Sequence, residues 1–560
     1  MKTGQVTGAV PLRLELSESA SLGDSYHVRC IRLNLMTLAV NSNELLPKYG
    51  TLFENILVFF HELSIILIKK VNSVKINLGK FRLSQPWQIL SEQTWNSRRL
   101  SMYQINFQNP IHIYFIGIGG ISMSGLAEIL LSEGFRVSGS DRAASPLTHT
   151  LEEKGAAVYY GQRKENIPAD IDLVVYTSAI KPDNPELLAA GQRAIPVLTR
   201  AQLLGQMMQN YEMPIAVSGT HGKTTTTSMI SQILLEHHAD PTLSIGGIYK
   251  PIGGNIRVGS SAYFVTEACE YTNSFLSFFP KIGIILNIEE DHLDYFKDIH
   301  DIRNSFRKFA NLLPSDGVLI INGDIEHYKE LTRDLNCRVI TYGSSSGLDY
   351  YPANITYDAS GCPSFHLMHK DGKEEVFSLR VPGEHNVYNA IAAIALADLL
   401  EIPTATTAEA LLAYGGTDRR FEYKGTVNGV TVIDDYAHHP TEITATLLAA
   451  RNYPHRTTWC VFQPHTYTRT RDFMADFARA LSLSDEVILA DIYAAREKDT
   501  LGISSRTLQA EIEKLGHRCY YFPSFSEIEN FLLENCTKDD LLITMGAGDI
   551  VKVGEDLLQK

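Results

Sequence analysis

Short runs of apolar, often β-branched residues alternate with longer Ala- and Leu-rich segments from about residue 111 onward. This alternation is typical of parallel sheets whose strands are joined by crossover helices. Three such blocks follow one another, at 111–211, at 215–416 and beyond 417. A chain of 560 residues is also too long for one hydrophobic core, so we predict an α/β protein of several domains. The clearest strand candidates are residues 111–116, 215–217, 263–266, 430–433, 459–462, 487–490 and 541–544.

The net charge of the chain changes sign where this alternation begins. Residues 1–101 hold 12 Lys and Arg against 7 Asp and Glu, a net charge of +5, whereas the remaining residues carry −19. We predict an N-terminal extension at 1–101 and domains at 102–211, 212–416 and 417–560. Since Met102 stands just before the first predicted strand, the extension is expected to be dispensable for catalysis. The alternative is an accessory domain or a membrane-surface arm, because basic residues follow the apolar run at 56–68.

Composition narrows the class of protein. A chain with 44% hydrophobic and 20% charged residues is an ordinary soluble protein, and a net charge of −14 argues against a nucleic-acid partner. Seven cysteines without CxxC spacing argue against a zinc site or a disulfide framework and favour a cytoplasmic location. The apolar run at 56–68 is shorter than the roughly 18–20 residues of a membrane span, so no stable membrane insertion is expected.

The strongest local motif is a glycine loop between a predicted strand and a predicted helix at 226–235. Glycines at 219 and 222 let backbone N–H groups approach phosphate oxygens at a helix N-terminus. Lys223, expected to be a partly exposed loop residue, can neutralise the β- and γ-phosphates, and Thr224 can bind Mg²⁺. A simple glycine turn before a helix is the alternative. The predicted ATP-binding residues of this loop are Gly219, Thr220, His221, Gly222, Lys223, Thr224 and Thr225.

The GTHGKTT string of this loop resembles the Mur ligase family, and further strings follow in the family's order. They read TEACE at 266–270, an N-x-x-x-D-H-x-D pattern at 287–294 and PGEHNVYNAIAA at 382–393. The resemblance implies that Glu267 binds Mg²⁺ together with Thr224, and that His292 binds a second Mg²⁺. A role for Glu270 is less clear, since it could simply be solvated. Asn386 and Asn389 share one helix face, where they could hold the nucleotide.

Two strings in the last block complete the catalytic set that the resemblance implies. They read RRFE at 419–422 and DDYAHHP at 434–440, with Ala437 where the family usually has glycine. By resemblance, Arg420 contacts the γ-phosphate and Asp435 lies near the ribose or the reacting centre. The predicted catalytic residues are Lys223, Glu267, His292, Arg420 and Asp435.

The strings FQPHTYTRT at 462–470 and DIYAARE at 491–497 are similar to the amino-acid-binding region of the family's alanine-adding branch. His465 and Arg469 are therefore candidates to bind the amino-acid carboxylate. Thr466 stands where arginine is commoner, which weakens the comparison at that position.

The first block contains the glycine-rich string FIGIGGISMSG at 115–125, which lacks the third glycine of a dinucleotide fingerprint because Ser122 stands there. In Mur ligases a similar turn cradles the pyrophosphate of the UDP substrate. By resemblance, Gly117, Gly119, Gly120 and Asp141 bind that substrate, with Asp141 near the uridine. A strand-to-helix turn without a ligand is the alternative.

The resemblance covers nearly all of residues 102–560. It implies a Rossmann-like UDP-binding domain, a P-loop ATPase domain with a central parallel sheet and a Rossmann-like C-terminal domain. The implied activity is ADP-forming ligation through an acyl phosphate, with ATP and Mg²⁺ as cofactors and UDP-N-acetylmuramate and L-alanine as partners. Three alternatives are a sister ligase that adds another amino acid or a peptide, a nicotinamide-dependent oxidoreductase and a non-catalytic nucleotide-binding regulator.

Overall fold

The computed structural model describes residues 15–17, 30–32, 104–177, 179–495 and 497–560. The chain divides into two compact units, Met1–Ser101 and Met102–Lys560. In the first unit, β1 (Glu15–Ser17) and β2 (Cys30–Arg32) pair antiparallel. The apolar run at 56–68 and the basic residues after it lie outside the described residues. No helix in the described part of the chain is both long and apolar enough to cross a bilayer.

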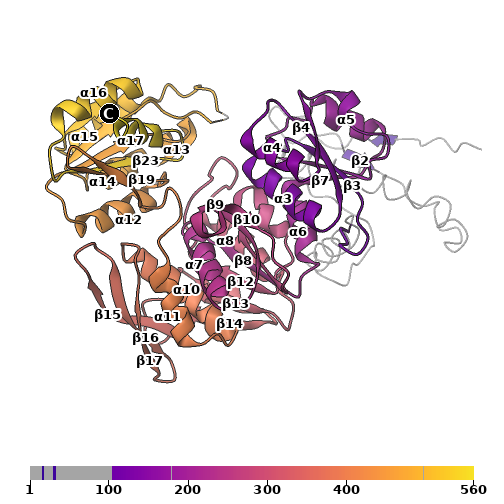
Figure 1. Cartoon of the computed structure of the whole chain (residues 1–560), viewed down its shortest axis with the longest axis horizontal. Helices are drawn as coiled ribbons and strands as arrows, with labels where there is room; N and C mark the ends of the chain where they lie inside the picture. Colours follow the sequence, from indigo (N-terminus) through magenta and orange to yellow (C-terminus); the bar gives the residue numbers. More distant parts are fainter. Residues whose placement is uncertain (1–14, 18–29, 33–103, 178, 496) are drawn as a thin grey trace, which may run out of the picture. The chain divides into compact units, whose positions relative to one another are not determined.

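The first sheet of the larger unit has five parallel strands in the order β5-β4-β3-β6-β7 (Figure 1). Because strand order reverses on the two sides of β3, the loops after β3 and β6 meet at a topological switch point, where open sheets bind ligands. The elements are β3 (His112–Ile116), α3 (Ile121–Ser132), β4 (Arg136–Asp141), α4 (Pro146–Glu153), β5 (Ala157–Tyr160), η1 (Lys164–Asn166), β6 (Leu173–Tyr176), α5 (Pro185–Gln192), β7 (Val197–Thr199) and α6 (Arg200–Met208).

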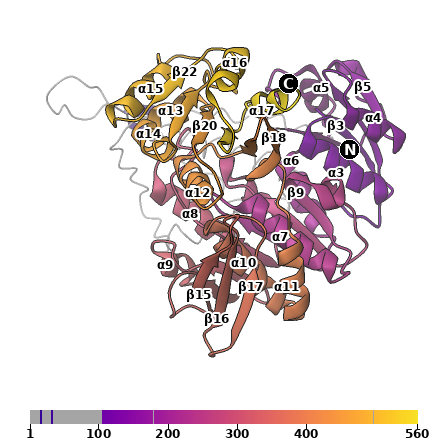
Figure 2. The same cartoon turned by 60° about the vertical axis from the view of Figure 1, so that its left-hand side comes forward.

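The second sheet has ten strands in the order β10-β9-β11-β8-β12-β13-β14-β15-β16-β17. Its centre is parallel, as predicted, but β10 and the β15–β17 end are antiparallel (Figures 1 and 2), which the sequence pattern did not indicate. The elements are β8 (Met213–Ser218), α7 (Lys223–Glu236), β9 (Thr242–Tyr249), η2 (Lys250–Ile252), β10 (Gly254–Arg257), β11 (Tyr263–Ala268), η3 (Tyr271–Ser277), β12 (Ile282–Ile285), α8 (Ile299–Ala310), β13 (Val318–Asn322), α9 (Tyr328–Thr332), β14 (Arg338–Tyr342), β15 (Tyr350–Tyr357), β16 (Pro363–His369), β17 (Glu374–Ser378), α10 (His385–Leu399) and α11 (Thr404–Ala413).

Side chains of the central strands alternate between two cores, because successive residues of a strand point to opposite faces of the sheet. Ile215 and Val217 of β8 pack in one core with α7, α10 and α11. Ala216, between them, packs in the other core with α6 and α8. Both faces of β8 are therefore covered by helices, which explains why this strand reads as an unbroken apolar run.

The third sheet has six strands in the order β18-β19-β23-β20-β21-β22, with only β18 antiparallel to its neighbour. Its elements are β18 (Glu422–Val427), β19 (Val430–Asp435), α12 (Pro440–Arg451), β20 (Thr458–Phe462), α13 (Tyr467–Asp472), α14 (Met474–Leu481), β21 (Glu486–Leu489), α15 (Ser505–Lys514), β22 (Cys519–Tyr521), α16 (Phe525–Asn535), β23 (Leu541–Met545) and α17 (Val551–Leu557). Together the three sheets confirm the predicted α/β class.

Glycines allow close contact between elements of the first and second sheets. A Cβ atom on Gly205 of α6 would lie 1.9 Å from the carbonyl oxygen of Ser277 in η3. A Cβ atom on Gly125 of α3 would lie 2.0 Å from Cγ1 of Ile256 in β10. These contacts leave no room for a methyl group, so the two glycines set how closely the helices pack.

We predict that Gly205→Ala destabilises the protein by about 1–3 kcal/mol, because the added methyl group meets backbone that must move. Gly191→Ala is the matched control. This second glycine is also helical, but a Cβ atom there would have nothing within 4 Å, so roughly 0.5–1 kcal/mol of stabilisation is expected. Urea unfolding measures both variants. Equal midpoints for the two variants would contradict the packing role of Gly205.

Candidate active site

The predicted phosphate loop connects β8 to α7. Gly219 (φ +145°) and Gly222 (φ +81°) adopt backbone conformations that other residues rarely reach. A Cβ atom on Gly222 would lie 2.6 Å from Oδ1 of Asn389, so only glycine lets the loop pass this close to α10. The loop opens the 14-residue helix α7, whose first N–H groups and positive dipole end face whatever the loop binds. This arrangement suits the phosphates of a nucleotide.

Lys223 is partly exposed, as expected, but it is the first residue of α7 and not a loop residue. Its side chain is 16% exposed, and Nζ donates to the Thr220 carbonyl and to the Glu270 carboxylate, both at 3.0 Å. Glu270 is 2% exposed, which corrects the expectation that it is solvated. Burial acts to lower the pKa of Lys223, but Glu270 outweighs burial and raises that pKa. The lysine is therefore a charged, ion-paired group.

Thr224 and Glu267 lie side by side beneath the loop. The Thr224 hydroxyl donates to the Glu267 carboxylate at 3.1 Å, and Glu267 also accepts from the backbone N–H of Gly246. Burial raises the pKa of Glu267. A hydroxyl and a carboxylate are the oxygen ligands that Mg²⁺ prefers, so this pair fits the predicted metal.

His292 approaches Glu270 rather than Glu267. Its Nε2 is 3.9 Å from the Glu270 carboxylate, and its ring lies 4.4 Å from that of Tyr271. His292 has a φ of +54°, an uncommon conformation that is often found at functional sites. Burial lowers the pKa of His292, which favours the neutral imidazole that a metal requires. His292 and Glu270 therefore form a second candidate ligand pair.

Asparagine side chains hold the loop in place. Asn287 accepts from the His221 N–H at 2.7 Å and donates to the His221 carbonyl at 3.1 Å. Asn389 accepts from the Thr226 hydroxyl of α7 and donates to Asn386, so the two predicted asparagines of α10 are linked and Asn389 contacts α7. Asn287 belongs to a predicted string but was not itself expected to act. Its two hydrogen bonds to the backbone of His221 could not be predicted from the sequence, because the two residues are far apart along the chain.

Arg420 lies just before β18, the first strand of the third sheet along the chain, and its side chain reaches the glycine loop. Its Nη2 lies 3.5 Å from Oγ1 of Thr224, and its guanidinium lies 5.2 Å from the centre of the Tyr436 ring. A cavity of about 270 Å³ is bordered by Arg420, Asp435, Thr225, Asn389 and other residues of both sheets. Its position over the glycine loop, with polar side chains set in a largely apolar lining, suits a nucleotide.

Asp435 is buried beside this cavity at the end of β19. Its carboxylate accepts hydrogen bonds from the N–H groups of Phe421 and Ala437 and from the Thr446 hydroxyl. Burial raises its pKa to about 6. Because all three donors belong to the third-sheet part of the chain, Asp435 fixes the loop that carries Arg420.

Glu442 is a functional candidate that sequence reasoning missed. It lies in the first turn of α12 and pairs with Nδ1 of His221 and with Nδ1 of His438, both at 3.2 Å. Burial acts to lower the pKa of His221, but Glu442 and Glu289 raise it to about 9. The ion pair therefore links the glycine loop to the third sheet. The sequence does carry a signal for Glu442, because a glutamate three residues after an N-cap, here His439 of α12, is typical of a capping box.

His465 and Arg469 lie together, as predicted. The Arg469 guanidinium donates through Nε and Nη2 to Asp291 Oδ1, at 3.2 and 2.7 Å, and its Nη1 lies 3.0 Å from Nδ1 of His465. Burial lowers the pKa of His465 to about 3, assisted by His438 and Arg469, so this imidazole is neutral. Both residues line a cavity of about 300 Å³. Asp291 already takes two of the arginine's donors.

The glycine turn of the first sheet is closed by Asp141. The backbone N–H of Gly119 donates to the Asp141 carboxylate at 2.8 Å. Gly117 has a φ of +84°, and a Cβ atom on Gly119 would lie 2.8 Å from Thr148. Gly120 caps α3 without any side-chain hydrogen bond to its first N–H groups. The four predicted residues therefore meet at the start of α3.

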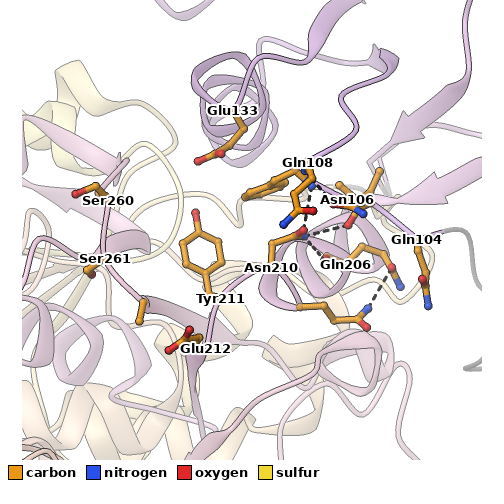
Figure 3. Close-up of a pocket in the computed structure, with 15 residues that line it drawn as sticks. Gln104, Asn106, Gln108, Glu133, Gln206, Asn210, Tyr211, Glu212, Ser260 and Ser261 are labelled. Carbon is orange, nitrogen blue, oxygen red and sulfur yellow. Dashed lines mark hydrogen bonds between the residues drawn. The ribbon is translucent and has the colours of Figure 1, made fainter.

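A separate cavity of about 790 Å³ opens beside Asn210 and Tyr211 (Figure 3). Its walls are rich in amide side chains, and Asn210 bonds to the Phe107 N–H and the Ile105 carbonyl. It lies near the first residues of β8 and β11, whereas the glycine loop follows the last residues of β8. It is therefore remote from the predicted chemistry.

Comparisons with known proteins agree with the motifs. The Mur ligase family catalytic domain matches residues 112–212, the Mur ligase middle domain matches 217–397, and the glutamate ligase domain of Mur ligases matches 419–548. The chain belongs to the Mur ligase family. Its relatives include the UDP-N-acetylmuramate–L-alanine ligases of Agathobacter rectalis and Lachnospira eligens. They are 60% and 59% identical over 459 residues, which cover 82% of this chain and 100% of each relative.

Solved structures of Mur ligases resemble it too. The UDP-N-acetylmuramate–alanine ligase of Thermotoga maritima has a TM-score of 0.67 and 29% identity, covering 80% of this chain and 98% of that one. A murein peptide ligase of Psychrobacter arcticus has a TM-score of 0.59 and 25% identity, with the same coverage.

We predict that Lys223→Ala lowers turnover at least about hundredfold, because it removes charge stabilisation of the transferring phosphoryl group. It also removes the ammonium group that pairs with the buried Glu270 carboxylate, at a cost of about 3–5 kcal/mol. Adding Glu270→Gln should restore most of the stability and none of the turnover. Phosphate release and urea unfolding measure the two effects. Near-normal turnover in Lys223→Ala would refute the phosphate-loop assignment.

Proposed function

We propose that this chain joins L-alanine to the carboxylate of UDP-N-acetylmuramate through an acyl phosphate, forming ADP in the synthesis of peptidoglycan precursors. The observation that carries the proposal is the meeting of Lys223, Glu267 and Arg420 around one glycine loop. It occurs in a chain 60% identical, over a relative's whole length, to a ligase of that name. The cofactors are ATP and Mg²⁺.

The proposed roles of the loop residues follow from their charges. Lys223 and Arg420 would neutralise charge on the γ-phosphoryl group while the muramoyl carboxylate attacks it. To do so, Lys223 must exchange Glu270 for phosphate oxygens. Thr224 and Glu267 would hold one Mg²⁺, and His292 with Glu270 a second. Bound Mg²⁺ supplies neutralising charge to the phosphoryl oxygens.

The acceptor would bind in the cavity beside His465 and Arg469. Asp291 accepts from two donors of Arg469, and a third lies beside His465 Nδ1, so one N–H on each of Nη1 and Nη2 and Nε2 of the neutral His465 imidazole are left for the L-alanine carboxylate. A cavity of about 300 Å³ suits a small amino acid better than a tripeptide. The UDP-sugar would bind at the turn formed by Gly117, Gly119, Gly120 and Asp141.

We propose domain boundaries at 102–211, 212–416 and 417–560, for the UDP-sugar, for ATP and for the amino acid respectively. We also propose a cytoplasmic location. The supporting observations are the nucleotide substrates, which the cytoplasm supplies, and the six described cysteines, which are all free thiols.

Phosphate release tests the proposed function directly. With UDP-N-acetylmuramate, ATP and Mg²⁺ present, we expect release that depends on L-alanine and is absent with a tripeptide acceptor. Release with the tripeptide but not with L-alanine would identify a sister ligase instead. ATP binding without release for any acceptor would identify a nucleotide-binding regulator. NAD(P)H binding without ATP turnover would identify an oxidoreductase.

We predict that a chain beginning at Met102 folds and ligates alanine as well as the full chain does. The family matches all lie after residue 111, and the 459 residues aligned with the relatives equal the length of the unit Met102–Lys560. The measurement is kcat/KM for both chains, with mass spectrometry of the native protein to locate its N-terminus. Loss of activity on truncation, or native peptides from residues 1–101, would contradict the prediction.

A further inference from the structure

Arg200 carries a charge that the protein does not neutralise. It is the first residue of α6, directly after β7, and its side chain is half-buried. Its Nη1 donates to the hydroxyl of Ser122 at 3.0 Å. Among the residues that the structure describes, no carboxylate pairs with it. By contrast, Arg419 pairs with Asp434, and Arg469 pairs with Asp291.

Burial lowers the pKa of the Arg200 guanidinium, the direction expected for a desolvated cation.

The surroundings of Arg200 point to an anion. A guanidinium has five N–H donors, and only one of them has a partner in the described structure. Ser122 lies in the first turn of α3, a 12-residue helix. Its N-cap is Gly120, so no N-cap side chain accepts from the first N–H groups of the helix. The open helix start and the unpaired arginine therefore present positive charge to the same space.

We propose that Arg200 binds the diphosphate of the UDP-sugar substrate, together with the first N–H groups of α3. The proposal rests on the proposed function and adds a residue to it. The diphosphate is favoured over the sugar's carboxylate because a helix N-terminus is a phosphate site, whereas the carboxylate must react near Lys223. Because Arg200 contacts Ser122 in the first turn of α3, the bound diphosphate would lie at the glycine turn of the first sheet.

Titration calorimetry of the full chain with UDP, uridine and ATP tests this assignment. Arg200→Gln should weaken UDP binding about ten- to hundredfold, as expected for lost charge-assisted hydrogen bonds, and leave uridine and ATP binding unchanged. Arg200→Lys keeps the positive charge but loses the planar guanidinium with its paired N–H donors. Its affinity for UDP should lie between those of the unmodified chain and Arg200→Gln. The matched control is Arg136→Gln. Arg136 is an exposed arginine at the first residue of β4. The glycine turn lies at the other end of this strand, beside its last residue, Asp141.

Unchanged UDP binding in Arg200→Gln would overturn the proposal. If UDP binding held while the KM for UDP-N-acetylmuramate rose, Arg200 would serve the carboxylate, and the diphosphate assignment would be wrong. Thermal unfolding checks that each variant is folded. If a folded Arg200→Lys loses as much UDP affinity as Arg200→Gln does, the contact depends on two N–H donors of the guanidinium, and Arg200 is still the diphosphate ligand. UDP binding needs no turnover, so this test is separate from alanine-dependent phosphate release by the unmodified chain.

Discussion

The site depends on the adjacency of three parallel strands, β11, β8 and β12. Val217 of β8 pairs in register with Glu267 of β11, and Ser218 pairs with Ile285 of β12. Because parallel strands end at the same edge, the glycine loop, the carboxylate of Glu267 and the segment that leads to His292 must emerge together. Both faces of the strands are buried by helices, so this order cannot slip without exposing a core.

The third-sheet part of the chain completes the site through polar contacts with the loop. Glu442 pairs with His221, and Asp291 pairs with Arg469, so each side contributes one acid and one base. Asp435 makes its hydrogen bonds within its own part of the chain and so holds the segment that presents Arg420. Charged pairs of this kind fix orientation more than they add stability.

The sequence motifs located the strand ends and the glycine loop because each is a local pattern, an apolar run followed by a polar string. The side-chain pairs could not be predicted in this way, because their members are far apart in the sequence. Glu270 is buried only because Lys223, 47 residues earlier, folds back to meet it. The antiparallel strands β15–β17 also escaped the pattern, since their partly exposed faces lack a long apolar run. The roles of the site residues stay predictions.

The ion pair between Lys223 and Glu270 has a consequence for the form of nucleotide that the loop accepts. Lys223 is already matched by one carboxylate, and Glu267 stands close by, so the loop offers a free nucleotide tetra-anion little net attraction. A divalent ion bound with the nucleotide would be held by the carboxylates of Glu267 and Glu270 and would leave the ammonium group of Lys223 free for the phosphates. The charge balance of the loop would therefore favour the metal-chelated nucleotide over the bare anion and over other polyphosphates that carry no metal.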